Sequence, residues 1–300
     1  MNKMKENNIA TLQEEKLELI DITTQQKTTI LKEDVVKIKR YHNSNIIFSI
    51  PHSSTLVDQR CFEFREYLNK ILKDTDMHTS IVYDLQLGTI IEGVCNPYMI
   101  NYSRSRESVD DKRGVFAWEF LDSSSIFKKH YSHELQEELL TLYYDSYHEA
   151  LEEEIQNQLK KQGFAFLIDC HSMAKIPIKG CVATDDTLRP DICIGTLESR
   201  SIDLNIAQEL KEFFENQGYE TTIDVPYKGG YITQKYSQMK NVYVIQIELS
   251  KELYCYNSLE DNFKLKEEEL QQLQNALREG FQVTYNRVAA NYKSGDEVEN

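Results

Sequence analysis

The stretch FAFLIDCHSM, residues 164–173, decides the fold. It opens with the apolar residues of a fully buried strand and continues into Asp169 and His171. The segment before it, residues 133–161, repeats leucines at helical spacing and is followed by Gly163. A helix, a glycine and then an apolar strand is the order expected in an α/β layer fold. In such folds, polar residues at the ends of strands commonly form the ligand-binding or active site.

Other segments repeat this pattern along the chain. Strands are predicted at residues 45–50, 98–103, 191–196, 219–225 and 241–249, and helices at 58–72, 201–218 and 261–289. We therefore predict an α/β fold in a single domain over residues 41–292, with a mixed, mostly parallel sheet and helices on both faces. Residues 1–40 are predicted to be an N-terminal extension with one or two edge strands, and residues 293–300 a flexible tail.

Composition narrows the class of protein. A chain of 300 residues can bury a sizeable core, and its net charge of −15 disfavours nucleic acid and anionic membranes as partners. No apolar run approaches the roughly 20 residues needed to span a bilayer, and the N-terminus lacks the apolar core of a signal peptide. We expect a cytoplasmic protein whose six scattered cysteines are reduced thiols rather than zinc ligands.

Three residues at predicted strand ends carry the chemistry. His52 follows the strand at 45–50, His171 follows the apolar run at 164–168, and Glu248 sits among apolar residues in VIQIEL. Strand alternation leaves open whether Glu248 faces solvent or the site. Two histidines and carboxylates are ligands that zinc takes, and a nearby carboxylate can accept a proton from an activated water. The pattern indicates a zinc-dependent hydrolytic site.

Further residues are candidates for contacts with a substrate. Arg104 and Arg106 follow the predicted strand at 98–103, and arginine binds carboxylates through two hydrogen bonds. The loop PYKGGYIT could bring Lys228, Gly229, Gly230 and Tyr231 against a ligand, or could be an ordinary turn. His148, on the long helix among tyrosines, is more typical of a packed, hydrogen-bonded core group than of a ligand.

Several short stretches together resemble a known family. They occur in order over about residues 45–256: FSIPHSS, DTDMHTSIVYD, YYDSYHEAL, LIDCHSM, RPDICIGT, PYKGGYIT and IQIELSKELY. In them the chain is similar to the N-formylglutamate amidohydrolase family, within the wider group of zinc carboxypeptidase-like hydrolases. The resemblance implies a phosphorylase/hydrolase-like fold. It also implies a metal-dependent amidohydrolase that cleaves the linear amide C–N bond of a small N-acyl amino acid such as N-formylglutamate.

The resemblance also implies roles for individual residues. One zinc ion per chain, or another divalent metal, would be held by His52 and His171. We expect Asp76, in DTDMH, to be the third ligand. Asp169 is the competing candidate, although its expected role is to orient His171. Glu248 would be the general base.

One stretch departs from the family. Arg104 is kept and would hold the substrate carboxylate, but Pro97 and Asn101 stand where the family usually has Arg and Asp. Arg106 could supply the lost cation. The amino acid of the substrate therefore stays open, and so do two alternative functions. The sequence also leaves the oligomeric state open. The first alternative is a zinc carboxypeptidase or amidase acting on a peptide or cell-wall fragment, and the second is an inactive relative that only binds.

Overall fold

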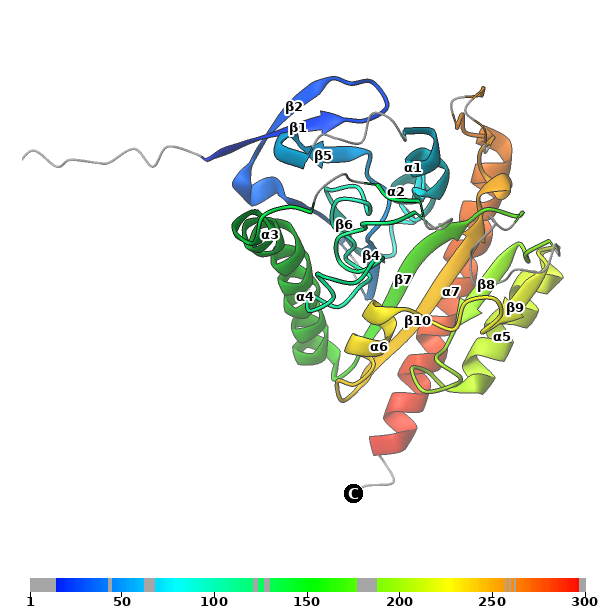
Figure 1. The fold of residues 1–300 in the computed structure, drawn as a ribbon. Coiled ribbons are helices and arrows are strands. Elements are labelled where there is room, and N and C mark those ends of the chain that lie inside the picture. Colours follow the sequence, from blue (N-terminus) through cyan, green and yellow to red (C-terminus); the bar gives the residue numbers. More distant parts are fainter. Residues whose placement is uncertain are drawn as a thin grey trace, which may run out of the picture.

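A computed structural model describes residues 15–42, 45–61, 68–120, 124–126, 130–176, 188–256, 258, 260–261 and 263–296. Its main sheet has seven strands in the order β3-β6-β4-β7-β10-β8-β9 (Figure 1). The strands are β3 (Val36–Arg40), β4 (Ile46–Ile50), β6 (Gly88–Gly93), β7 (Ala165–Met173), β8 (Ile192–Gly195), β9 (Thr221–Ile223) and β10 (Val242–Ser250). Only β3–β6 and β8–β10 pair antiparallel, which confirms the predicted mixed, mostly parallel sheet.

A second, smaller sheet lies beside the first. It is antiparallel, in the order β2-β1-β5, and consists of β1 (Lys16–Asp21), β2 (Lys27–Leu31) and β5 (Leu56–Asp58). Residues 15–40 thus supply two strands of this sheet and the edge strand β3 of the main sheet. The described part of the predicted N-terminal extension is therefore part of the two sheets.

Helices cover both faces of the main sheet, as predicted (Figure 1). Alternate residues of β7 explain why: Ala165 and Leu167 belong to one buried apolar cluster, and Phe166 and Ile168 to the other. A strand that is apolar on both faces needs a covering layer on each side. The helices are α1 (Leu68–Asp74), α2 (Thr79–Val82), α3 (His133–Leu139), α4 (Ser146–Gln162), α5 (Leu204–Asn216), α6 (Tyr231–Tyr236) and α7 (Glu267–Asp296).

The helix predicted over 133–161 is present, with a π-helical segment between α3 and α4 at Leu140–Asp145. It ends at Gly163, whose φ of 84° is the left-handed conformation that glycine adopts readily. The final helix α7 extends to Asp296, so the beginning of the predicted tail is helical, and residues 297–300 lie outside the described residues.

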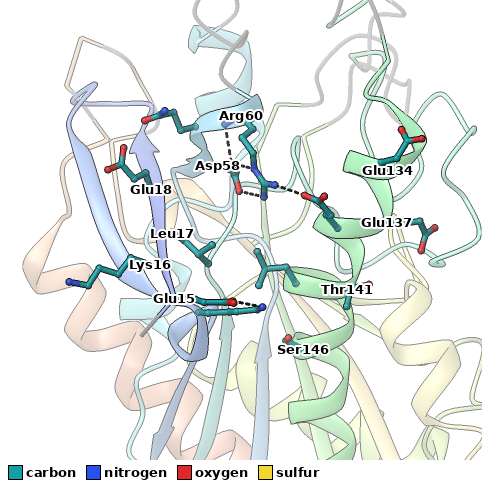
Figure 2. A pocket seen from close by; sticks show the side chains of 14 residues that line it. Glu15, Lys16, Leu17, Glu18, Asp58, Arg60, Glu134, Glu137, Thr141 and Ser146 are labelled. Carbon is teal, nitrogen blue, oxygen red and sulfur yellow. Dashed lines mark hydrogen bonds and ion pairs between the residues drawn. The ribbon is translucent and has the colours of Figure 1, made fainter. Parts of the chain in front are cut away.

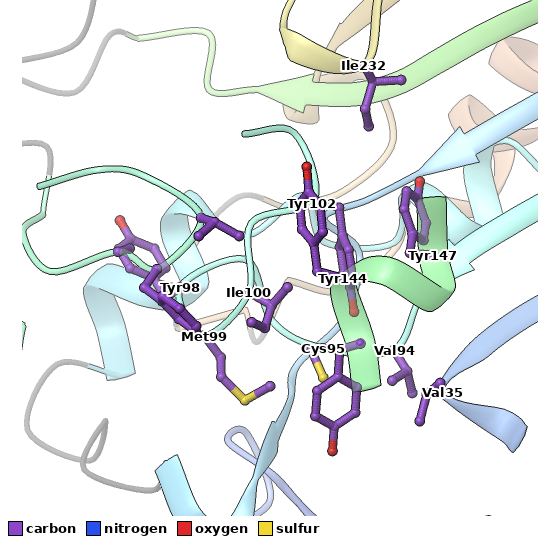
Figure 3. Close-up of a cluster of buried hydrophobic side chains, with 14 of the residues drawn as sticks. Val35, Val94, Cys95, Tyr98, Met99, Ile100, Tyr102, Tyr144, Tyr147 and Ile232 are labelled. Carbon is purple, nitrogen blue, oxygen red and sulfur yellow. The ribbon is translucent and has the colours of Figure 1, made fainter. Parts of the chain in front are cut away.

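The prediction of a strand at 98–103 is wrong. The segment turns instead, because the carbonyl of Asn96 accepts hydrogen bonds from the N–H groups of Met99 and Ile100. Its apolar side chains are nevertheless core residues: Tyr98, Met99, Ile100 and Tyr102 belong to one buried cluster, in which Figure 3 shows Tyr102 beside Tyr144. Burial of an irregular loop produced the apolar pattern that resembled a strand.

The helix predicted at 58–72 is only partly comparable with the structure. Asp58 ends β5, residues 62–67 lie outside the described residues, and α1 occupies Leu68–Asp74. Among the helices described, none has the length and apolar character required to cross a membrane.

Candidate active site

Three neighbouring parallel strands bring the predicted residues to one edge of the sheet. His52 lies two residues after β4, while His171 and Glu248 lie near the carboxyl ends of β7 and β10. His171 and Glu248 are register partners across the β7–β10 pair. β7 does not stop at Asp169 but continues to Met173, so His171 lies within the strand and shares a face with Asp169.

Asp76 reaches the same edge from the loop between α1 and α2. Its backbone N–H donates to the carbonyl of His52 at 3.1 Å, and the Thr79 hydroxyl donates to the carbonyl of Asp76 at 2.8 Å. The carboxylate oxygen Oδ2 then lies 3.5 Å from His52 Nδ1 and 3.3 Å from His171 Nδ1. The Ser172 hydroxyl donates to Oδ1 at 3.2 Å.

His52, Asp76 and His171 form a group that could hold a metal ion, since one donor atom from each lies within 4.8 Å of the others. Ligands about 2.0–2.1 Å from zinc at tetrahedral angles lie about 3.3 Å from one another. The two separations between Asp76 Oδ2 and the imidazole nitrogens match that spacing. Two imidazoles and one carboxylate are also a donor set found in catalytic zinc sites, which keep a further position open.

The other nitrogen of each imidazole is already engaged. His171 Nε2 lies 3.2 Å from Asp169 Oδ1, and His52 Nε2 lies 2.9 Å from Asn101 Oδ1. A proton on Nε2 that is donated to these oxygens leaves Nδ1 unprotonated in the neutral imidazole. Asp169 is itself held by the hydroxyls of Ser49 at 3.2 Å and Thr233 at 3.4 Å. The contact between Asp169 and His171 Nε2 is the one that an orienting role of Asp169 requires.

Electrostatics in the cluster favour an ionised Asp76. Burial alone would raise the pKa of this carboxyl group, but hydrogen bonds from His171 and His52 hold the pKa well below its usual range. Burial opposes protonation of His171, yet Asp169 and Asp76 raise the pKa of its imidazole well above the ordinary value. In the absence of metal, therefore, positive charge is strongly favoured at the position where a cation would bind.

Glu248 faces this cluster rather than solvent, since only 8% of the residue is exposed. Burial and the charges of Asp76 and Asp169 raise the pKa of Glu248 to about 8, against the opposing charge of His171. Gln246 Nε2 donates to Glu248 Oε1 at 3.0 Å, and the N–H of Gly230 donates to Gln246 Oε1 at 2.6 Å. The Gly-Gly loop thus supports Glu248 through Gln246.

A pocket of about 160 Å³ opens beside His52. It is lined by His52, Asp74, Pro97, Tyr98, Asn101, Arg104, Arg113, Gly114, Ala117 and Glu119. Arg104, the predicted substrate-binding cation, is one of the residues that line this pocket. The pocket is smaller than the roughly 300–1,000 Å³ typical of sites for drug-sized ligands.

A model of the N-formylglutamate amidohydrolase family matches residues 44–255. The chain belongs to this family. An N-formylglutamate deformylase of Pseudomonas putida is 25% identical in an alignment that covers 82% of this chain and 95% of the relative. A deformylase of the same description from Pseudomonas aeruginosa is also 25% identical, over 74% of this chain and 86% of the relative.

The fold of this family member is that of solved relatives. It is similar to the crystal structure of an N-formylglutamate amidohydrolase from Ralstonia eutropha JMP134, with a TM-score of 0.74 and 16% identity over 87% of this chain and 99% of the other. A protein of Agrobacterium tumefaciens gives a TM-score of 0.64 at 13% identity, over 86% of this chain and 96% of the other.

Other predicted substrate contacts lie elsewhere in this amidohydrolase-family chain. Arg106 donates to Asp145 at 2.9 Å and to Glu137 at 3.1 Å, and it does not line the pocket beside His52. Lys228 forms an exposed ion pair with Glu198. Gly229 and Tyr231 also do not line that pocket; Gly229 adopts a φ of 120°, and the half-buried Tyr231 begins α6.

His148 has the packed environment that its helical position suggested. Its Nδ1 lies 2.8 Å from the Tyr236 hydroxyl and its Nε2 lies 3.0 Å from the carbonyl of Tyr102. Burial, together with the charge of Lys235, lowers the pKa of His148 to about 3. The imidazole is therefore neutral at physiological pH and links α4 to two other segments.

Two features could not be found from the sequence. Arg113 lines the pocket, yet only the following glycine hints at a tight turn there. A larger cavity, about 820 Å³, is separate from the site and lies between β1 and α3 (Figure 2). Glu15, Glu18, Asp58, Glu134 and Glu137 give it an acidic lining, and no predicted site residue contributes to it.

Proposed function

We propose that this chain is a zinc-dependent amidohydrolase that cleaves the amide bond of a small N-acyl amino acid such as N-formyl-L-glutamate. Membership of the N-formylglutamate amidohydrolase family and the similarity to two N-formylglutamate deformylases support the reaction class. The observation that carries the proposal is the buried Glu248 in register with His171, beside a cluster of two histidines and one carboxylate that could hold a metal ion.

His52, Asp76 and His171 would hold the metal, each imidazole through Nδ1. Zinc bound there would lower the pKa of a coordinated water and polarise the amide carbonyl. By accepting from Nε2, Asp169 and Asn101 would leave Nδ1 of each neutral imidazole available to the metal.

Glu248 would act as the general base. Its Oε1 accepts a hydrogen bond from Gln246, which leaves Oε2 to take a proton from the attacking water and to deliver it to the leaving amine. Burial and the neighbouring carboxylates raise the pKa of Glu248 to about 8 in the metal-free protein, and a zinc ion beside it would favour the ionised carboxylate that accepts a proton. A general base works best when its pKa lies near the working pH.

Arg104 would hold the carboxylate of the substrate in the pocket beside His52. The small volume of this pocket, about 160 Å³, favours an N-acyl amino acid over a peptide or cell-wall fragment.

The proposal is tested by measuring formate release from N-formyl-L-glutamate with zinc-loaded protein. The Glu248→Gln variant keeps the size of the side chain and removes the base, so we expect kcat to fall by about 10²–10⁴-fold with zinc content unchanged. Glu212→Gln, on the exposed face of α5, is the matched control and should retain full activity. Absence of hydrolysis by the wild type, or an unchanged rate in Glu248→Gln, would contradict the proposal.

A further inference from the structure

Two arginines line the pocket beside His52. Arg104 was predicted from the sequence, and Arg113 comes from a loop 9 positions further along the chain. A second guanidinium in so small a pocket can bind a second anionic group of a ligand, provided that the loop is held in place and that no acidic side chain already pairs with it.

The loop that carries Arg113 is fixed to the metal-binding edge of the site. Arg113 forms an isolated antiparallel bridge with Ala117. The N–H of Val115 donates to the Ser108 hydroxyl at 2.9 Å, and the N–H of Asn101 donates to the carbonyl of Val115 at 2.8 Å. Asn101 also binds His52 Nε2, so a short chain of contacts connects the arginine loop to a proposed metal ligand.

Close packing at Gly114 fixes the position of the loop further. A Cβ atom added at Gly114 would lie 1.8 Å from the carbonyl oxygen of Ser108, so only glycine fits at this turn. The backbone next to Arg113 is therefore held in place by steric contacts as well as by hydrogen bonds.

Both guanidinium groups are available for a ligand. Within the described part of the chain, neither Arg104 nor Arg113 donates a side-chain hydrogen bond or forms an ion pair. The pocket's carboxylates are otherwise engaged, because Asp74 accepts from the Tyr98 hydroxyl and Glu119 pairs with Lys112 at 2.9 Å.

The two arginines are also close enough to interact electrostatically. Although much of the Arg104 side chain is exposed, close packing around its guanidinium and the positive charge of Arg113 both lower the pKa of Arg104. Two like charges near each other in a small pocket favour a ligand that carries two negative charges.

We propose that Arg113 is the specificity-determining residue of this pocket and that it binds the side-chain carboxylate of an acidic N-acyl amino acid. Arg104 then binds the other carboxylate. The inference rests on the proposed function for the acyl amino acid as the type of ligand, but it concerns binding and not hydrolysis.

Arg106 is the other arginine that the sequence offered as a second substrate-binding cation. Its guanidinium spans Asp145 and Glu137, and it points to α3 and the π-helical segment instead of the pocket. A ligand carboxylate would have to displace both acidic partners of Arg106, whereas Arg113 has no acidic partner among the described residues.

The test compares binding of N-formyl-L-glutamate and N-formyl-L-glutamine, which differ only in the charge of the side chain. Calorimetry on metal-free protein measures affinity without hydrolysis. Wild type is compared with Arg113→Gln and with Arg106→Gln as the matched arginine control, each checked for native thermal unfolding. We expect Arg113→Gln to weaken binding of the glutamate ligand by about 10- to 100-fold and of the glutamine ligand by less than about threefold.

Arg106→Gln should preserve the wild-type preference for the glutamate ligand. The inference would be overturned if Arg113→Gln weakened binding of both ligands equally or of neither. It would also be overturned if the wild type showed no preference between the ligands, or if Arg106→Gln lost that preference instead. Failure of the proposed function is a separate result: the zinc-loaded wild type would not release formate, while the Arg113-dependent preference in binding would persist.

Discussion

At the scale of single residues, the site depends on which nitrogen of each imidazole stays unprotonated. Asn101 Oδ1 accepts from His52 Nε2 at 2.9 Å and also from the N–H of Ser103 at 3.0 Å. A neutral amide thus supplies the acceptor that orients this imidazole, without a negative charge behind it.

Asn101 gives a prediction for metal affinity. Asn101→Leu removes the acceptor and should weaken zinc binding by about 10- to 100-fold, whereas Asn101→Asp keeps an oxygen at the same place and should bind at least as tightly as the wild type. Competition with a chromogenic chelator measures both affinities. Equal zinc affinity in the Leu variant and the wild type would show that Asn101 does not position His52.

His148 gives a prediction for the pH dependence of stability. Its folded pKa of about 3 lies below the ordinary value near 6.5, so the unfolded chain takes up a proton that the folded protein excludes. The native state therefore loses stability as pH falls from 6.5 toward 3. Between pH 7 and pH 5 this loss amounts to about 2 kcal/mol.

Metal-free His148→Gln, which can keep both hydrogen bonds, should lose about 2 kcal/mol less than metal-free wild type over the same interval. Urea unfolding at pH 7 and pH 5 measures the difference. Parallel losses in the two proteins would mean that His148 is not held neutral in the fold.

Several site residues were predictable because their chemistry conflicts with their surroundings in sequence. Glu248 and His171 stand out as polar groups in apolar runs, and the structure buries both. Arg113 could not be found in that way. It lies in a polar loop, and its importance arises only from hydrogen bonds of Val115 to Ser108 and Asn101 that join distant segments.

At the scale of elements, the order of the strands in the sheet decides which functional side chains lie next to one another. β4, β7 and β10 are adjacent and parallel, so residues at their carboxyl ends meet at one edge. Helix and strand periodicity predicted these elements well. It failed at residues 98–103, because a loop buried against α4 has the same apolar content as a strand but satisfies its backbone through turns.

The pairing of β4 and β6 gives a prediction for folding stability. Gly88 begins β6 opposite Ile46, and a Cβ atom there would lie 1.9 Å from the carbonyl oxygen of Ile46. Gly88→Ala must displace the backbone of β4, the strand that precedes His52. We expect the free energy of unfolding to fall by more than about 2 kcal/mol, as is typical of steric overpacking.

Urea unfolding measures the effect of Gly88→Ala. Thr29→Ala, in the exposed part of β2, is the control and should change stability by less than about 1 kcal/mol. A Gly88→Ala protein within about 0.5 kcal/mol of wild type would show that β4 and β6 are not packed as closely as described.

At the scale of the whole molecule, the proposed metal site connects separate parts of the chain. His52 follows β4, Asp76 comes from the loop before α2, and His171 comes from β7. A ligand that binds only the folded state stabilises it by an amount that grows with the logarithm of its concentration. Zinc at about 1,000 times its dissociation constant should therefore add about 4 kcal/mol to the free energy of unfolding.

This stabilisation should appear as a rise in the midpoint of thermal unfolding when zinc is added to metal-free wild type. His171→Ala removes a ligand and should show little or no rise. His42→Ala, an exposed histidine outside the cluster, should respond as the wild type does. An equal zinc response in His171→Ala and wild type would place the stabilising metal elsewhere.

The metal content of the purified protein shows whether His52, Asp76 and His171 hold a metal ion. Elemental analysis should find about one zinc ion per chain in wild type and in His42→Ala, and almost none in His171→Ala. Wild-type protein that holds no metal and takes up none when zinc is supplied would contradict the account. It would leave a member of the amidohydrolase family with the family's fold and without a metal-dependent reaction.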